Sequence, residues 1–209
     1  MIVTDIRPVT KRTYRVEIEG QLAFILYKGE LSRYRIVCGE EIQEQEFSEI
    51  MNEILPLRAK RYAMNLLVKM DRTERELREK LKKNGYPAEV SRKAVDYVKS
   101  YGYIDDARYA EHYFERYKDS LSVRQISWKL SQKGVDPGLI EKAAEKAELT
   151  DHEQVIRALV EKRMRNRDEV TEKDIRKLEA YLARRGFYGE EIWKVLKDYR
   201  FRVQEKTME

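Results

Sequence analysis

The sequence predicts a mainly α-helical protein, with three tandem three-helix repeats in an elongated array after a small N-terminal antiparallel β segment. Composition favours helices, because 209 residues include only 9 Gly and 4 Pro and so contain few turn formers for a β-sandwich. Charged residues make up 39% and hydrophobic residues 42%, which spreads the apolar side chains along amphipathic elements. Helix-cap signals also recur at a constant interval, which indicates an internal repeat.

The N-terminal region differs from the rest by its strand-like patterns. These patterns occur in residues 2–6, 13–19, 22–27 and 34–37. The dipeptide Gly20-Gln21 separates the middle two segments and predicts a hairpin, and the outer segments extend the sheet to three or four strands. Near Glu46 the spacing becomes helical without a Pro- or Gly-rich linker. We therefore expect a strand-rich extension over 1–45, attached to helical modules that fold without it.

The repeat is defined by three helix starts. Thr73, Ser122 and Thr171 each lie 49 positions apart, and each is followed three residues later by an acidic or amide side chain, as in a capping box. A glycine closes each following helix, at Gly85, Gly134 and Gly186. The distance from cap to glycine is 12, 12 and 15 residues, so the third helix is longer by about one turn.

Each capped helix lies between two other segments with apolar stripes, which makes a three-helix module. A unit of roughly 45–50 residues buries part of its core against its neighbours. The predicted modules are 46–103 with a lead-in helix, 104–149, and 150–209 with the C-terminal tail.

The sequence predicts a protein without an active site of its own. It contains no nucleophile elbow, P-loop, GxGxxG, HExxH or CxxC motif. One Cys and two His leave few candidates for a nucleophile, a general base or a structural zinc site. Asp105 and Asp106 are adjacent carboxylates, and we interpret Asp105 as a helix cap rather than a metal ligand. We expect no catalysis, no cofactor and no metal.

The same features predict a cytoplasmic protein. The lone Cys38 cannot form an internal disulfide, which fits a reducing compartment. The N-terminus does not resemble a signal peptide, and no window approaches 18 apolar residues. We therefore expect no membrane association.

Positive charge is concentrated in one part of the chain. The net charge is +5, yet residues 58–83 contain ten basic and four acidic side chains. Solvated helix faces explain many such runs, but this excess goes beyond i,i+4 pairing and indicates an anionic partner, either DNA phosphates or an acidic protein surface. The 14 Tyr fit helix cores and junctions better than base stacking. The candidate contact residues are Arg72, Arg75, Arg78, Lys82 and Lys83 in the first module, Arg124, Lys129 and Lys133 in the second, and Arg163, Arg165 and Arg167 in the third.

Four segments together resemble the RecX family of bacterial recombinase regulators. They are DRTERELREKLKKNG (71–85), YGYIDDARYA (101–110), ISWKLSQKGV (126–135) and RRGF (184–187). The resemblance covers residues 57–200, and the strand-rich extension is similar to that of some members. Two features depart from the family pattern: residues 119–122 replace a turn that usually contains Gly, and the third module has its longer spacing.

The resemblance implies a curved array of three modules that binds in the helical groove of the RecA filament on DNA. It further implies a monomer that modulates strand exchange and ATP hydrolysis by the filament. The expected partners are RecA and single- or double-stranded DNA. The expected processes are recombination regulation, DNA repair and the SOS response. The alternative is a stand-alone helical DNA-binding protein without a recombinase partner, favoured by tight and steeply salt-dependent binding to DNA alone. An enzyme is the third and most distant reading.

Overall fold

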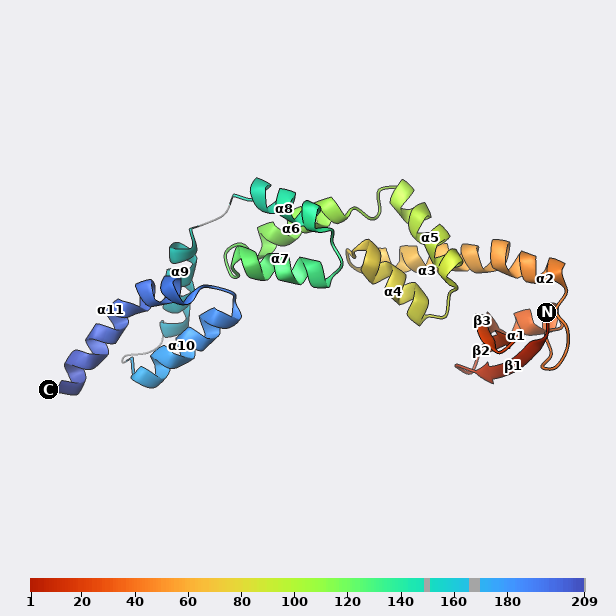
Figure 1. Cartoon of the computed structure of the whole chain (residues 1–209), viewed down its shortest axis with the longest axis horizontal. Coiled ribbons are helices and arrows are strands. Elements are labelled where there is room, and N and C mark those ends of the chain that lie inside the picture. The colour runs from red at the N-terminus through yellow and green to blue at the C-terminus, as the bar shows by residue number, and fades with distance from the viewer. Residues whose placement is uncertain (149–150, 166–169, 209) are drawn as a thin grey trace. The chain divides into compact units, whose positions relative to one another are not determined.

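The computed structural model describes residues 1–148, 151–165 and 170–208, and the chain divides into two compact units, Met1–Asp105 and Asp106–Glu209 (Figure 1). The fold is mainly helical, with a small antiparallel sheet at the N-terminus and helices grouped in threes. The predicted domain boundaries after residues 45 and 103 stay predictions, and the boundary at 149–150 lies outside the described residues.

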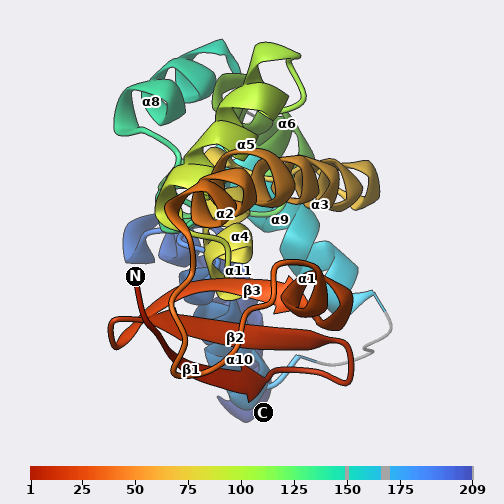
Figure 2. The same cartoon turned by 90° about the vertical axis from the view of Figure 1, so that its right-hand side faces the viewer.

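The N-terminal sheet contains β1 (Val3–Pro8), β2 (Thr13–Ile18) and β3 (Gln21–Tyr27) in antiparallel order β1-β2-β3, side by side in Figure 2. The predicted hairpin is confirmed, with its turn at Glu19-Gly20. Both turn residues have positive φ, 51° and 77°, as a two-residue turn between twisted strands requires.

The expected strand at residues 34–37 is wrong. A short helix, α1 (Lys28–Arg33), follows β3, and Tyr34 is its C-cap. The Ile36 N–H donates to the Leu31 carbonyl at 2.9 Å, and Arg35 between them has a φ of 47°. Tyr34 and Ile36 are both buried. The alternating burial that resembles a strand therefore comes from a left-handed turn that closes a helix.

A continuous helical run leads into the first module. It consists of α2 (Glu44–Glu49), the π-helical segment η1 (Ile50–Ile54) and α3 (Leu55–Lys69). Pro56 stands in the first turn of α3 and has no N–H to donate to the preceding turn. The wider π-helical turn directly before it fits this missing hydrogen bond.

The first module combines α3 with α4 (Glu74–Lys83) and α5 (Ala88–Ser100). The predicted cap is confirmed: the Glu76 N–H donates to Thr73 Oγ1 at 3.2 Å, and the Glu76 carboxylate accepts from the Thr73 N–H at 3.3 Å. Gly85, with a φ of 80°, follows α4 as expected. The module's buried side chains, among them Leu77 and Leu81, share one hydrophobic cluster with Phe24 and Leu26 of the sheet.

The second module contains α6 (Asp106–Tyr117), α7 (Val123–Gln132) and α8 (Pro137–Lys146). The Gln125 N–H donates to the hydroxyl of the predicted cap Ser122 at 3.2 Å, and Gly134 follows α7 with a φ of 83°. A separate hydrophobic cluster fills this module, formed by Ala110, Phe114, Ile126, Leu130, Val135, Ile140 and Ala143.

The third module contains α9 (His152–Met164), α10 (Glu172–Arg184) and α11 (Gly189–Met208). Thr171 and Asp174 form the predicted capping box, and Gly186 has a φ of 90°. The longer third helix is confirmed, because α10 has 13 residues whereas α4 and α7 each have 10. No helix among the described residues is long and apolar enough to cross a membrane.

Candidate partner-binding surface

Helix α4 positions the basic residues that the sequence singles out in the first module. Its apolar side chains, Leu77 and Leu81, are four positions apart and completely buried, so they hold one side of the helix against the core. The capping box at its start and Gly85 at its end fix its length. The remaining sides of α4 are charged and face solvent. We call the predicted residues Arg72, Arg75, Arg78, Lys82 and Lys83 the α4 surface.

These five cations differ in how far they are available to a partner. Arg75 and Arg78 are exposed, but each is paired one turn away, with Glu79 at 3.0 Å and Glu74 at 2.6 Å. Lys82 and Lys83 are exposed and make no ion pair within the described part of the chain.

Arg72 is less exposed than the other four residues of the α4 surface. It stands just before α4, is half-buried, and its Nε is buried without a hydrogen-bond partner among the described residues.

Glu74 links α4 to α5 and forms ion pairs with Arg78 of the α4 surface and Lys99 of α5. Lys99 Nζ donates to Glu74 at 2.7 Å and, with Arg78, holds the pKa of that carboxyl below its usual range. Arg78 therefore serves a carboxylate of its own chain, and the exposed net charge of α4 comes chiefly from its C-terminal end.

Two hollows flank α4, and every residue of the α4 surface except Arg75 lines at least one of them. One, of about 600 Å³, is lined only by charged side chains: Arg72, Glu76, Glu79, Lys80, Lys82 and Lys83. The other, of about 440 Å³, has an apolar floor that includes Leu22 and Pro87 and is bordered by Arg78, Lys82 and Arg92 without any carboxylate. Lys82 belongs to both. Arg92 is not among the residues predicted from the sequence, because it lies outside the basic run of 58–83.

In the second module, two of the three predicted cations make contacts inside the chain. Arg124 Nη2 donates to the Gly186 carbonyl at 3.1 Å, and its guanidinium lies over the Tyr188 ring at 4.5 Å. Lys133 Nζ lies 5.6 Å from the centre of the Tyr109 ring. Lys129 is half-buried. The three residues therefore do not form one open basic patch.

In the third module, Arg163 lies over the Tyr181 ring at 4.3 Å, and Arg185 lies over the same ring at 4.5 Å. Arg165 is exposed at the end of α9. Arg167 lies outside the described residues.

Sequence reasoning also missed three large aromatic side chains that are exposed in the second unit. Trp128 is 55% exposed on α7, Tyr188 is 55% exposed before α11, and Trp193 is 56% exposed on α11. The signal for Trp128 is its position between Ile126 and Leu130, because a residue two positions from each cannot share their buried stripe. Aromatic side chains in such positions are common at protein interfaces.

Three family models match the chain, each over one module. They describe the first three-helix domain of RecX at residues 59–97, the second at 105–143 and the third at 151–196. Among the described residues, no group of three or more His, Cys, Asp or Glu is placed to hold a metal ion.

Full-length relatives extend the match to the N-terminal sheet. Regulatory protein RecX of Caldanaerobacter subterraneus subsp. tengcongensis is 34% identical over 199 residues, which cover 94% of this chain and 98% of that protein. Regulatory protein RecX of Clostridium acetobutylicum is 25% identical over 204 residues, covering 94% and 95%.

Two solved structures share the fold. A crystal structure of regulatory protein RecX has a TM-score of 0.57 at 23% identity and covers 94% of this chain and 98% of its own. The crystal structure of RecX from Lactobacillus salivarius has a TM-score of 0.56 at 22% identity, covering 71% and 98%.

Proposed function

The chain belongs to the RecX family of regulatory proteins, and from this premise we propose that it binds the RecA filament on DNA and modulates the filament's recombinase and ATPase activities without a catalytic site of its own. The observation that carries the proposal is the match of all three modules, in order, together with a relative aligned over nearly the whole chain. Recombination regulation in the cytoplasm, by a monomer that contacts RecA and DNA, is part of the same proposal.

The α4 surface supports a contact with an anionic partner. Lys82 and Lys83 extend from the last turn of α4, next to Gly85, and Arg75 lies seven positions before Lys82 on the same side of the helix. Their mutual repulsion is only partly offset by Glu79 and Glu76 nearby. Phosphates or acidic side chains of a partner relieve this repulsion, and the gain falls as salt rises.

We test the proposal with a charge reversal of two exposed residues, Arg75→Glu and Lys82→Glu. Binding to RecA filaments on single-stranded DNA, followed by fluorescence anisotropy over a salt series, should weaken, and inhibition or stimulation of filament ATP hydrolysis should weaken with it. Helix content by circular dichroism should stay unchanged because both side chains are exposed.

The matched control reverses Arg35 and Lys69, one Arg and one Lys that are exposed in the same unit and lie outside α4. This control should bind filaments like the parent. If the Arg75→Glu, Lys82→Glu variant also binds like the parent at moderate salt, the α4 surface is not the contact. The next candidates are then Arg124, Lys129 and Lys133, or Arg163, Arg165 and Arg167.

A stand-alone DNA-binding protein is the competing function, favoured by the exposed aromatic side chains and the exposed Arg165 of the second unit. If this is the function, the chain should bind bare DNA as tightly as it binds RecA filaments, and its affinity for DNA should fall steeply as salt rises. A regulator of the filament binds filaments more tightly than bare DNA at the same salt concentration.

A further inference from the structure

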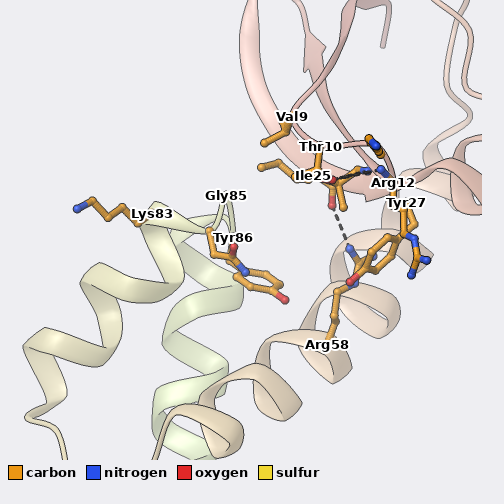
Figure 3. A pocket seen from close by; sticks show the side chains of 12 residues that line it. Val9, Thr10, Arg12, Ile25, Tyr27, Arg58, Lys83, Gly85 and Tyr86 are labelled. Carbon is orange, nitrogen blue, oxygen red and sulfur yellow. Dashed lines mark hydrogen bonds between the residues drawn. The ribbon is translucent and has the colours of Figure 1, made fainter.

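A third cavity lies between the sheet and the first module, and it shares Lys83 with the α4 surface. It has a volume of about 630 Å³, which is in the range of ligand sites. Four parts of the first unit line it: the β1–β2 loop, the end of β3, Arg58 of α3, and the α4–α5 turn (Figure 3). The lining residues are Val9, Thr10, Lys11, Arg12, Thr13, Ile25, Tyr27, Arg58, Lys83, Asn84, Gly85 and Tyr86.

The charge of this cavity is entirely positive. Four of its lining residues are cations and none is a carboxylate. Lys11 and Arg12, in the β1–β2 loop, are exposed and make no ion pair within the part of the chain that the structure describes. Lys83 stands at the far rim with its side chain extended away from Tyr86 (Figure 3). Two neighbouring loop cations without a local counter-ion favour an anionic ligand.

Arg58 gives the cavity a rigid wall. Its Nη2 donates to both Glu30 carboxylate oxygens at 2.6 Å, and its Nη1 donates to the Ile25 carbonyl at 3.2 Å. Its guanidinium also lies 4.6 Å from the centre of the Tyr27 ring. Glu30 neutralises Arg58, so the net charge available to a ligand comes from the loop residues, while Arg58 holds the aromatic wall in place.

Two tyrosines also line the cavity, and they add a hydrogen-bond donor and an exposed aromatic ring to its positive charge. Tyr86 points from the α4–α5 turn toward Arg58 (Figure 3), and burial raises the pKa of its phenol to about 12, so the hydroxyl stays protonated and can donate a hydrogen bond. Tyr27 is 45% exposed, although Arg58 covers part of its ring. An exposed aromatic ring beside cations is a platform for stacking a base.

We propose that this cavity binds a nucleotide, with the phosphate at Lys11 and Arg12 and the base against Tyr27. The phosphate has two possible sources, the backbone of single-stranded DNA and a free nucleoside diphosphate. In the first case the site extends the proposed function, because the N-terminal sheet then contacts the DNA that the filament covers.

The test replaces both loop cations, Lys11→Gln and Arg12→Gln, in the full chain. The first probe is a short fluorescein-labelled oligothymidylate, and the second is ADP, each titrated into the protein over a salt series. For the oligonucleotide, the logarithm of the association constant falls linearly with the logarithm of the salt concentration, and losing two phosphate contacts should make this slope shallower by about 1.4. Binding at about 0.1 M salt should weaken by about tenfold or more.

The matched control is Arg35→Gln with Lys69→Gln, which removes the same charge elsewhere in the unit. Selective weakening of the oligonucleotide assigns the site to nucleic acid, and selective weakening of ADP assigns it to a free nucleotide. If the loop variant and the control bind both probes equally, the cavity is not a nucleotide site. Neither Lys11 nor Arg12 belongs to the α4 surface, so filament binding by the Arg75→Glu, Lys82→Glu variant reports separately on the proposed function.

Amide chemical shifts provide a second measurement that needs no variant. Addition of the oligothymidylate or ADP, whichever binds, to the ¹⁵N-labelled protein should change the amide chemical shifts of residues 9–13 and 83–86 together, because both segments line the cavity. Shifts confined to other parts of the chain would overturn the proposal.

Discussion

Arg58 shows how a single residue in a basic run can serve the fold rather than a partner. The sequence places it at the start of the most basic stretch of the chain. In the structure its side chain is 19% exposed, and it joins α3 to Glu30 of α1 and to the backbone of β3. Arg suits this role because its planar guanidinium donates from Nη2 to the carboxylate and from Nη1 to the backbone carbonyl, and stacks on an aromatic ring at the same time.

Removing this side chain should destabilise the protein. Arg58→Met keeps the apolar stem but leaves Glu30 half-buried without its partner, so we expect the free energy of unfolding to fall by about 2–4 kcal/mol. Urea unfolding followed by circular dichroism measures the change. Arg75→Met is the control, because the Arg75–Glu79 pair is exposed on both sides, and it should change stability by less than about 0.5 kcal/mol. Equal effects of the two substitutions would show that the Arg58 contacts are not stabilising.

At the scale of elements, the turn after α10 contacts the start of α7. The Ser122 N–H donates to the Arg185 carbonyl at 3.0 Å, and Arg185 Nη1 donates to the Ser120 carbonyl at 2.7 Å. A Cβ at Gly186 would overlap the Ser122 hydroxyl and the Gln125 side chain. Gly186 is therefore required twice, for its positive φ and for the close approach of two modules.

Gly102 offers a matched control for this double requirement. It also has positive φ, at 70°, but a Cβ there meets nothing within 4 Å. Gly102→Ala should cost about 1 kcal/mol from backbone strain alone, whereas Gly186→Ala should cost clearly more because Ser122 and Gln125 must also move. Thermal unfolding of the two variants gives the comparison, and equal losses would mean that the modules are not in close contact at this turn.

Helices α9 and α11 are joined by one carboxylate. Glu153 accepts hydrogen bonds from Lys194 at 2.6 Å and from Arg157 at 2.8 Å, and these two cations lower its pKa from 4.5 to about 2. Because the folded-state pKa lies below the unfolded one, the charged form stabilises the folded state. This contribution is complete above about pH 4.5 and is lost as the pH falls toward about 2.

Glu153→Gln should therefore make the stability of the protein depend less on pH between pH 5 and 2. Between pH 5 and 2, the urea midpoint of the variant should fall less than that of the parent, while at pH 7 the variant should be the less stable of the two. The control is Glu172→Gln, whose carboxylate pairs with Arg176 within α10 only and is exposed. An identical pH dependence for the parent and Glu153→Gln would contradict the stabilising role of the charged Glu153 carboxylate.

At the scale of the whole molecule, the N-terminal extension and the first module share their interior. Phe24 and Leu26 of β3 are completely buried in the same cluster as Leu77 and Leu81 of α4. A Cβ at Gly85 would overlap Ile25 of β3, so the α4–α5 turn lies directly against the sheet. Neither element can be removed without exposing apolar surface of the other.

Deleting residues 1–45 should thus destabilise α3 to α5, which is the opposite of the outcome that the sequence alone favours. Hydrogen exchange followed by mass spectrometry should show lost protection across residues 77–98. Residues 110–143 serve as the internal control and should keep their protection, because their core is a separate cluster. Protection retained in both regions would show that the first module folds without the sheet.

The local signals of this sequence determine its repeat. Thr73, Ser122 and Thr171 start helices, and the glycines that close those helices have positive φ, because caps and left-handed glycines act through hydrogen bonds and sterics within a few residues. The resemblance to RecX rests on the same short motifs, so the amino-acid sequence is sufficient to reveal it. The strand expected at residues 34–37 failed because a left-handed turn and a strand leave the same alternation of apolar residues.

Only the tertiary structure decides what each charged side chain does. Arg58 and Arg78 belong to the basic run of 58–83 and Arg124 is a contact candidate of the second module, yet each binds a carboxylate or carbonyl of its own chain, at Glu30, Glu74 and Gly186. Lys11 and Arg12 are far from Tyr86 in the sequence, yet all three line one cavity. Charge counts along a chain cannot show these pairings, because an ion pair depends on distances between atoms that only the packing of helices on the sheet brings together.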